Sequence, residues 1–129
     1  MFSKVSIIGC GLIGSSILRA VEEKKLASKI SVYDKELKVT DYLKKNFSLE
    51  ICSNVSDVVK DADLVIIASP LSSYKEILLS IESNLKENVI LTDTGSAKKE
   101  VNKIISNFNF KNVHWIASHP IAGTEYSGP

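Results

Sequence analysis

The sequence predicts an α/β fold, a doubly wound parallel sheet of about six strands in a single domain. Short apolar runs rich in β-branched residues alternate with segments of helical periodicity, and parallel strands need such helical crossovers. A glycine-rich turn, GxGxxG, joins the first apolar run to the first helix. The chain has 129 residues, 44% of them apolar, which suffices for one core without disulfides or metal.

Six apolar runs are predicted to be the strands, each followed by glycine or polar residues. They are residues 5–8, 30–33, 50–52, 64–68, 89–91 and 113–117. The run 64–68, Leu-Val-Ile-Ile-Ala, is continuous and apolar, as expected of a strand that is buried on both faces.

Between these runs, apolar residues recur every three or four positions, which predicts helices with one buried face. Ile13, Ile17 and Val21 mark the first helix, which ends in the charged residues 22–25. Weaker patterns predict helices at 37–47 and 55–60. The clearest helical face consists of Tyr74, Ile77, Leu78, Ile81 and Leu85. The last predicted helix has the face Ala97, Val101, Ile104 and Ile105. Right-handed crossovers then favour the doubly wound arrangement.

Charge and cysteine content exclude several classes of protein. Lys and Arg number 16 against 15 Asp and Glu, for a net charge of +1, so we expect no nucleic-acid partner. No apolar stretch approaches the roughly 20 residues that cross a bilayer, and the run before Cys10 is too short for a signal peptide. Cys10 and Cys52 form no CxxC pair, so no metal site is expected. These features favour a cytoplasmic protein.

The motif Gly9-Cys10-Gly11-Leu12-Ile13-Gly14 follows a predicted strand and opens a predicted helix, the context of a dinucleotide-binding turn. The first glycine permits the tight turn, the second lets the backbone approach a pyrophosphate, and the third lets helix and strand pack closely. The helix N-terminus adds amide donors and a positive dipole. We therefore predict a Rossmann-type domain over residues 1–129, with Gly9, Gly11, Leu12, Ile13 and Gly14 binding the cofactor.

Asp34 ends the second predicted strand, about 20 residues after Gly14, where such domains place an acidic residue against the adenosine ribose. Its carboxylate can accept both ribose hydroxyls and would repel a 2′-phosphate, which favours NAD. The neighbouring Lys35 and Lys38 leave NADP as an alternative. The alternative interpretation is a structural turn followed by a solvated aspartate, but the strand, the glycine motif and the acidic residue together favour dinucleotide binding.

Polar residues follow three other strands, and ligands bind at the carboxyl ends of strands in an open parallel sheet. Ser69, Pro70, Asp93 and Gly95 are predicted to contact the cofactor there. His119 follows the last strand and could take a proton from a substrate hydroxyl, whereas His114 lies earlier in that strand and is expected to be structural. Two alternatives stay open: Ser96 could only cap the next helix, and Lys98 could be a solvated residue of its first turn.

Four motifs together resemble the prephenate dehydrogenase (arogenate dehydrogenase) family of tyrosine biosynthesis. They are the glycine motif, Ala68-Ser69-Pro70, Asp93-Thr94-Gly95-Ser96-Ala97-Lys98 and His119-Pro120-Ile121-Ala122-Gly123-Thr124-Glu125. The glycine motif is common to many dehydrogenases. The D-x-G-S-x-K and H-P-x-A-G-T-E motifs are more particular, and the likeness spans nearly the whole chain.

The resemblance implies NAD(P)-dependent oxidative decarboxylation of prephenate to 4-hydroxyphenylpyruvate, or of arogenate to tyrosine. It makes His119 the group that contacts the ring hydroxyl and accepts hydrogen, with Ser96 orienting that contact. Both would then be catalytic and substrate-binding residues, and Thr124 and Glu125 would border the substrate site.

The family also has a helical C-terminal domain that dimerises and supplies an arginine for the substrate carboxylates, and this domain is absent from the present sequence. Arg19, the single arginine, lies on the first predicted helix and is unsuited to that role. We therefore expect the 129 residues to be the cofactor-binding half of the enzyme, with little turnover alone and with homodimers only in a full-length form.

Two other functions remain as alternatives. One is the N-terminal domain of a β-hydroxy-acid dehydrogenase, whose catalytic lysine would lie in a second domain. The other is a non-catalytic NAD-binding or redox-sensing module, in which Cys10, at a helix N-terminus, would have a lowered pKa. A small residue filling a tight turn is the simpler interpretation of Cys10.

Overall fold

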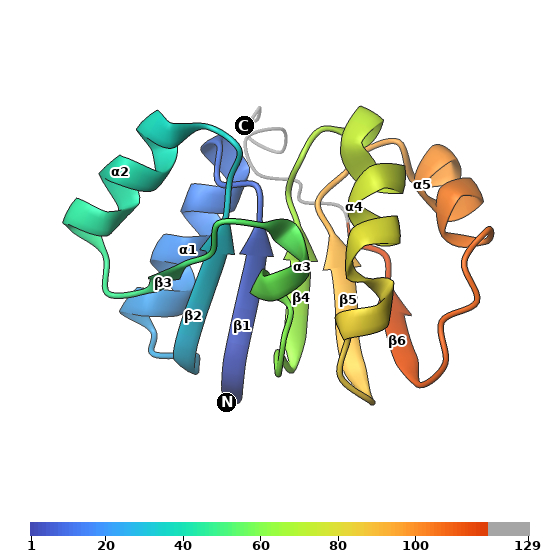
Figure 1. The fold of residues 1–129 in the computed structure, drawn as a ribbon, viewed down its shortest axis with the longest axis horizontal. Helices are drawn as coiled ribbons and strands as arrows, with labels where there is room; N and C mark the ends of the chain where they lie inside the picture. Colours follow the sequence, from blue (N-terminus) through green and yellow to red (C-terminus); the bar gives the residue numbers. More distant parts are fainter. Residues whose placement is uncertain (119–129) are drawn as a thin grey trace, which may run out of the picture.

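The computed structural model describes residues 1–118, so the predictions for His119, Thr124 and Glu125 fall outside the described residues. A six-stranded sheet has the order β3-β2-β1-β4-β5-β6, and all neighbouring strands are parallel (Figure 1). Its strands are β1 (Phe2–Ile8), β2 (Ala27–Tyr33), β3 (Glu50–Ile51), β4 (Leu64–Ile67), β5 (Val89–Asp93) and β6 (Val113–Ile116). The predicted Rossmann-type doubly wound sheet is confirmed.

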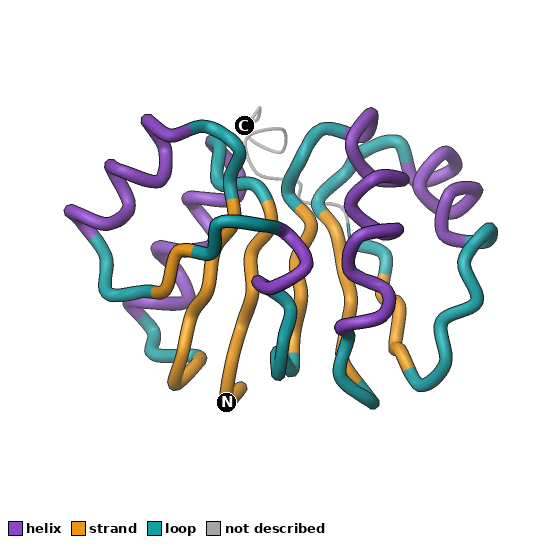
Figure 2. The backbone as a smooth tube through the Cα atoms, in the orientation of Figure 1, coloured by secondary structure: helices purple, strands orange, loops and turns teal. Residues whose placement is uncertain are grey.

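Helices connect successive strands and cover both faces of the sheet (Figure 2). They are α1 (Leu12–Glu23), α2 (Leu37–Asn46), α3 (Val55–Val58), α4 (Tyr74–Ile81) and α5 (Lys98–Ile105), with 3-10 turns η1 (Leu71–Ser73) and η2 (Glu82–Asn84). In Figure 1, α3 and α4 lie in front of the sheet and α1 lies behind it. Within residues 1–118, none of the helices has the length and apolar character to span a membrane.

Several predicted element boundaries were wrong, for identifiable reasons. β1 begins at Phe2 and β2 at Ala27, because the polar residues before each apolar run still pair along the two strands, as Lys4 does with Lys29. β5 continues to Asp93 because Ile67 and Asp93 pair in the ladder with β4. The helix predicted at 55–60 is a single turn, and η2 replaces the end of the helix expected to reach Leu85.

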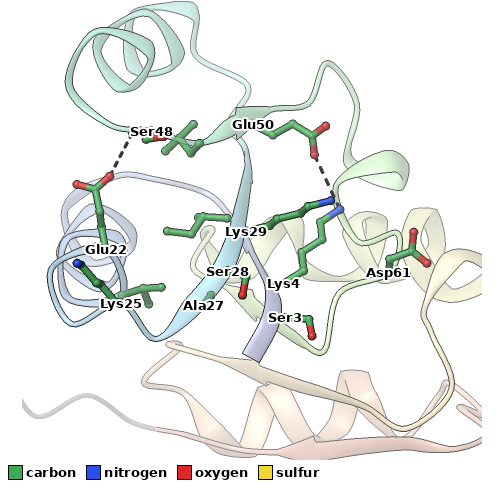
Figure 3. Close-up of a pocket in the computed structure, with 13 residues that line it drawn as sticks. Ser3, Lys4, Glu22, Lys25, Ala27, Ser28, Lys29, Ser48, Glu50 and Asp61 are labelled. Atoms are coloured by element: carbon green, nitrogen blue, oxygen red, sulfur yellow. Dashed lines mark hydrogen bonds and ion pairs between the residues drawn. The ribbon is translucent and has the colours of Figure 1, made fainter. Parts of the chain in front are cut away.

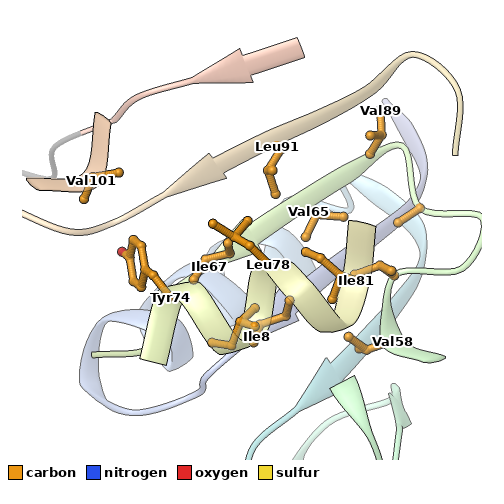
Figure 4. Packing of buried hydrophobic residues seen from close by; sticks show 13 residues of the cluster. Ile8, Val58, Val65, Ile67, Tyr74, Leu78, Ile81, Val89, Leu91 and Val101 are labelled. Atoms are coloured by element: carbon orange, nitrogen blue, oxygen red, sulfur yellow. The ribbon is translucent and has the colours of Figure 1, made fainter. Parts of the chain in front are cut away.

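The core consists of two apolar layers, one on each face of the sheet. One layer packs α1 and α2 on β1 and β2 and includes Val5, Ile7, Leu18, Val32 and Leu43. The other packs α3, α4 and α5 on β4 and β5, and Figure 4 shows its residues, among them Val65, Ile67, Leu78, Ile81 and Leu91. Each strand of the middle of the sheet therefore has apolar side chains on both sides, as its sequence predicted.

Two buried serines sit beneath the short helix α3. The hydroxyls of Ser6 on β1 and Ser31 on β2 both donate to the carbonyl oxygen of Val58, at 2.5 and 3.1 Å, and lie 3.1 Å from each other. Both serines are fully buried. This arrangement fixes α3 across β1 and β2 while leaving no hydroxyl of the pair without a partner.

Candidate active site at the carboxyl edge of the sheet

A pocket of about 1020 Å³ opens where β1, β2, β4 and β5 end. Most of the predicted site residues line it: Gly9, Gly11, Leu12, Ile13, Asp34, Ser69, Pro70, Gly95 and Ser96. The strand order puts β2 and β5 at its two ends, with β1 and β4 between them. The pocket therefore runs from Asp34, past the glycine turn, to the loop after β5.

Each of the three glycines of the turn is glycine for a different structural reason. Gly9 has φ +93°, and a Cβ there would lie 2.9 Å from the backbone of Ala68. A Cβ on Gly14 would overlap the carbonyl oxygen of Gly9, so the absence of a side chain brings α1 against the turn. A Cβ on Gly11 would meet nothing within 4 Å. Gly9 and Gly14 are thus required by packing, whereas Gly11 faces open space in the pocket.

The N-terminus of α1 faces the same space. Among the described residues no side chain caps it, and its first turn contains no acidic residue. Leu12 is 87% exposed and Ile13 45% exposed, and both line the pocket. The amide groups and dipole of this 12-residue helix suit a diphosphate, and the open space at Gly11 gives it room. A dinucleotide therefore fits the residues present.

Asp34 is fixed in place by the backbone. Its carboxylate accepts a hydrogen bond from the N–H of Cys10 at 2.7 Å and another from the N–H of Glu36 at 2.8 Å. These bonds hold the carboxylate beside the glycine turn without using all of its acceptor positions. It is thus oriented in advance for hydroxyl groups of a ligand.

Cys10 does not have the environment of a redox sensor. Burial of its side chain, and secondly the charge of Asp34, raise the pKa of the thiol to about 11. A reactive cysteine needs the opposite shift. The prediction of a lowered pKa is wrong, because the turn buries the side chain beside a carboxylate, and Cys10 acts as a small residue that fills the turn.

The side chain of Asp93 is directed into the protein rather than into the pocket. It is fully buried, and its carboxylate accepts hydrogen bonds from Tyr74 Oη and the Gly95 N–H, both at 2.9 Å. Lys98 Nζ lies 2.7 Å from the other oxygen. The Asp93 side chain therefore holds the loop in place. Its predicted direct contact with the cofactor stays a prediction.

Ser96 lines the pocket, and it does not cap α5. The N-cap residue is Ala97, without a side-chain hydrogen bond, and the alternative in which Ser96 only caps the helix is wrong. The alternative of a solvated Lys98 is wrong too, because its ammonium group is paired with the buried Asp93 and its side chain is only 24% exposed. Ser69 lines the pocket but donates its hydroxyl to the Ile8 carbonyl at 3.2 Å.

Hydrogen bonds join the carboxyl ends of β5 and β6 just before His119. Ser118 Oγ donates to the carbonyl oxygen of Asp93, and Thr92 Oγ1 donates to the carbonyl oxygen of Ile116 at 2.5 Å. At Ser118, its last described residue, the chain therefore passes beside the loop that contains Ser96.

His114 lies on β6 and is exposed rather than packed in the core. Arg19 donates to Tyr42 and lies over the Phe47 ring, not in the pocket.

A second pocket, of about 930 Å³, lies at the opposite, amino-terminal edge of the sheet (Figure 3). It is lined by residues of both charges. Glu50 forms an ion pair with Lys4 at 3.9 Å, and the Glu22 carboxylate accepts a hydrogen bond from the Ser48 N–H at 3.1 Å. Neither glycine turn nor helix N-terminus faces it. Ligands of parallel sheets bind at the carboxyl edge, and of these two pockets of the described residues, the one at that edge has a glycine turn and a helix N-terminus.

Sequence reasoning missed Tyr74 and part of the pocket lining. Tyr74 was assigned only to an apolar helix face, although its hydroxyl reaches Asp93. The signal was present, because it is the one residue of that face with a polar tip. The pocket lining also includes Tyr33, Val39, Val55, Leu71 and Ile77, which no motif marks.

The family described as "Prephenate dehydrogenase, nucleotide-binding domain" matches residues 17–129. The chain belongs to this family. It is 37% identical over 130 residues to the cyclohexadienyl dehydrogenase of Zymomonas mobilis, covering 100% of this chain and 44% of that protein. It is 33% identical over 127 residues to the prephenate dehydrogenase of Lactococcus lactis, covering 97% and 36%.

A solved structure shows the same likeness in three dimensions. The prephenate dehydrogenase of Aquifex aeolicus, crystallised in complex with hydroxyphenyl propionate and NAD+, superposes with a TM-score of 0.79 at 27% identity, covering 97% of this chain and 44% of that one. The chain thus spans less than half the length of each of these relatives. The resemblance inferred from the four motifs is confirmed at the level of the family.

Proposed function

We propose that the chain is the NAD-binding half of a dehydrogenase that oxidatively decarboxylates prephenate to 4-hydroxyphenylpyruvate. The observation that carries the proposal is the juxtaposition of an uncapped helix N-terminus, an open Gly11 and a fixed Asp34 in one pocket. Membership of the prephenate dehydrogenase family, and a relative crystallised with NAD+, support it.

Within the pocket, each feature has a part in binding. The α1 N-terminus and Gly11 would hold the pyrophosphate, and Asp34 would accept the adenosine ribose hydroxyls. A 2′-phosphate would bring negative charge against the fixed carboxylate of Asp34, which favours NAD over NADP. The other half of the dinucleotide then extends toward Ser69 and the loop 94–97, because the pocket continues from β1 through β4 to β5.

The cofactor supplies the hydride acceptor for this reaction. The protein has to orient the substrate carbon, accept a proton and let CO₂ leave as the ring becomes aromatic. We assign proton acceptance to His119 and the orientation of that contact to Ser96, with Thr124 and Glu125 at the substrate mouth. Ser96 lies in the pocket, and Ser118, the residue before His119, is hydrogen-bonded to the end of β5, which supports these assignments.

The cofactor proposal is tested by titrating the chain with NADH and with NADPH, following energy transfer from Trp115, its single tryptophan. We expect saturable binding of NADH and at least tenfold weaker binding of NADPH. Asp34→Asn should reduce this preference to a few-fold, and Asp41→Asn, an exposed aspartate of α2 outside the pocket, should leave it unchanged. Absence of binding by a chain that circular dichroism shows to be folded would refute the proposal.

The chemical step is tested in a protein of the relatives' full length that includes this sequence. His119→Asn should abolish NADH formation from prephenate while NADH affinity stays within about twofold. Assays of the unsubstituted protein with prephenate and with arogenate identify the substrate. Equal turnover by the variant and the unsubstituted protein would remove His119 from the chemistry.

A further inference from the structure

We propose that Tyr74 is a positioning residue for the nicotinamide half of the site: its hydroxyl, through Asp93, sets the loop Thr94–Ala97 against the cofactor. The inference rests on the proposed dinucleotide function. Tyr74 is the first residue of α4 and is fully buried, and in Figure 4 it lies at the end of the apolar cluster nearest Val101 of α5.

The loop is held by a small buried network. Asp93 Oδ2 accepts hydrogen bonds from Tyr74 Oη and the Gly95 N–H, and Asp93 Oδ1 pairs with Lys98 Nζ at the start of α5. Four residues of this loop, Thr94, Gly95, Ser96 and Ala97, line the pocket. The network thus fixes both ends of the segment that contains Ser96, one at β5 and one at α5.

Gly95 shows how closely the loop rests on the hydroxyl. A Cβ at Gly95 would lie 2.8 Å from Tyr74 Oη and 2.9 Å from Asp93 Oδ2, so the backbone packs on both groups directly. A buried carboxylate with one cationic partner depends strongly on its remaining donors. Without the hydroxyl, Oδ2 retains only the Gly95 N–H, and the loop loses the contact against which it is packed.

The hydroxyl is protonated at neutral pH. Burial, and then the hydrogen bond to Asp93, raise the pKa of Tyr74 well above its usual value of 10. The hydrogen bond therefore has one direction, from Tyr74 to the carboxylate. Phenylalanine at this position cannot form the hydrogen bond, but its phenyl ring leaves the apolar packing of α4 intact.

The position of the network predicts which half of the cofactor it affects. Asp34 and the glycine turn lie at the β2 and β1 end of the pocket, and the loop 94–97 lies at the β5 end. ADP-ribose ends after the pyrophosphate and its second ribose, whereas NADH extends on to the loop. Loss of loop order should therefore weaken NADH binding and leave ADP-ribose binding nearly unchanged.

The experiment measures the affinities of the 129-residue chain for NADH and ADP-ribose by calorimetry, at a temperature well below the unfolding midpoint. For Tyr74→Phe we expect about tenfold weaker NADH binding with ADP-ribose within about twofold. Lys98→Gln removes the cationic partner of Asp93 and leaves the apolar side chains packed around Tyr74 unchanged. It should show the same selective loss, and it provides a second test if Tyr74→Phe is unstable. Tyr42→Phe is the matched control, because it removes one exposed hydrogen bond, that of Arg19, and should change neither affinity.

A purely structural role would lower the unfolding temperature of Tyr74→Phe without changing the ratio of the two affinities, and that result overturns the proposal. Equal weakening of NADH and ADP-ribose binding also overturns it. If the unsubstituted chain binds neither compound, the proposed function itself fails, and the inference with it. If the unsubstituted chain binds NADH saturably and both variants keep the same ratio of NADH to ADP-ribose affinity, the role of Tyr74 is refuted while the proposed function stands.

Discussion

The glycine turn contains two glycines whose replacement by alanine should have opposite consequences. At Gly14 the new methyl group would overlap the carbonyl oxygen of Gly9, and the next neighbours are the Gly9 carbonyl carbon at 3.1 Å and Ala68 Cβ at 3.4 Å. The Gly9 atoms belong to the turn between β1 and α1, and Ala68 directly follows the neighbouring strand β4. At Gly11 the methyl group would meet no protein atom within 4 Å, and φ is −75°.

Overpacking against backbone typically costs about 1–3 kcal/mol, and we expect the upper end for Gly14→Ala because no side chain there can rotate away. In a domain of this size, about 3 kcal/mol corresponds to a fall of roughly 10 °C in the unfolding midpoint. Gly11→Ala should cost about 1 kcal/mol or less. Its methyl group stands where the pyrophosphate must approach, so NADH binding should weaken at least tenfold.

Thermal unfolding followed by circular dichroism, together with NADH titration, measures both quantities on each variant. The reasoning is refuted if Gly14→Ala is as stable as the unsubstituted chain, since the close approach of α1 to the turn would then be unnecessary. It is also refuted if Gly11→Ala binds NADH with unchanged affinity, because the open space at Gly11 would then not be the cofactor's.

Three further predictions concern single side chains. Cys10, with its pKa raised to about 11, should remain unmodified by a disulfide reagent at pH 8 in the folded chain and react in urea; equal rates would contradict its burial. The Lys86 ammonium, and then the Ser3 N–H, lower the pKa of Asp63. The ionised carboxylate therefore stabilises the folded chain above about pH 4, and this contribution is lost as the pH falls through the lowered pKa of the folded state. Asp63→Asn should therefore flatten the acid limb of stability measured by urea unfolding, and an unchanged slope would exclude that role. Lys25 has φ 51°, and Lys25→Gly should stabilise the chain by about 0.5 kcal/mol, whereas Lys24→Gly, at φ −90°, should destabilise it.

The predictable part of this molecule is the part that local sequence determines. The glycine turn and Asp34 were located because the motif, the strand before it and the helix after it all lie within a short stretch of chain. Strand centres were found from their apolar runs, but the first residues of β1 were missed. Ser3 and Lys4 are polar, and they are held by the carboxylate of Asp63 through their N–H groups, a contact between distant parts of the chain.

Asp93 shows why the other half of the site was harder to predict. Its position at the end of a strand was correct in outline, yet a carboxylate there can point to the ligand or to the core. The direction is decided by Tyr74 and Lys98, which come from two different helices. A periodicity analysis treats Tyr74 as one more apolar residue and Lys98 as solvated, so the polar tip of Tyr74 was the one sign of a buried partner.

The two serines beneath α3 affect how the domain folds. Strands β1 and β2 with α1 form a local unit that could assemble early, but it would then have Ser6 and Ser31 on an apolar face without the Val58 carbonyl that satisfies them. Burying hydroxyls without partners is unfavourable, so this face of the unit can be covered favourably only when α3 brings the Val58 carbonyl. The two halves of the sheet should consequently unfold in one transition, and amide hydrogens of β1 and β4 should exchange with the same free energy of opening.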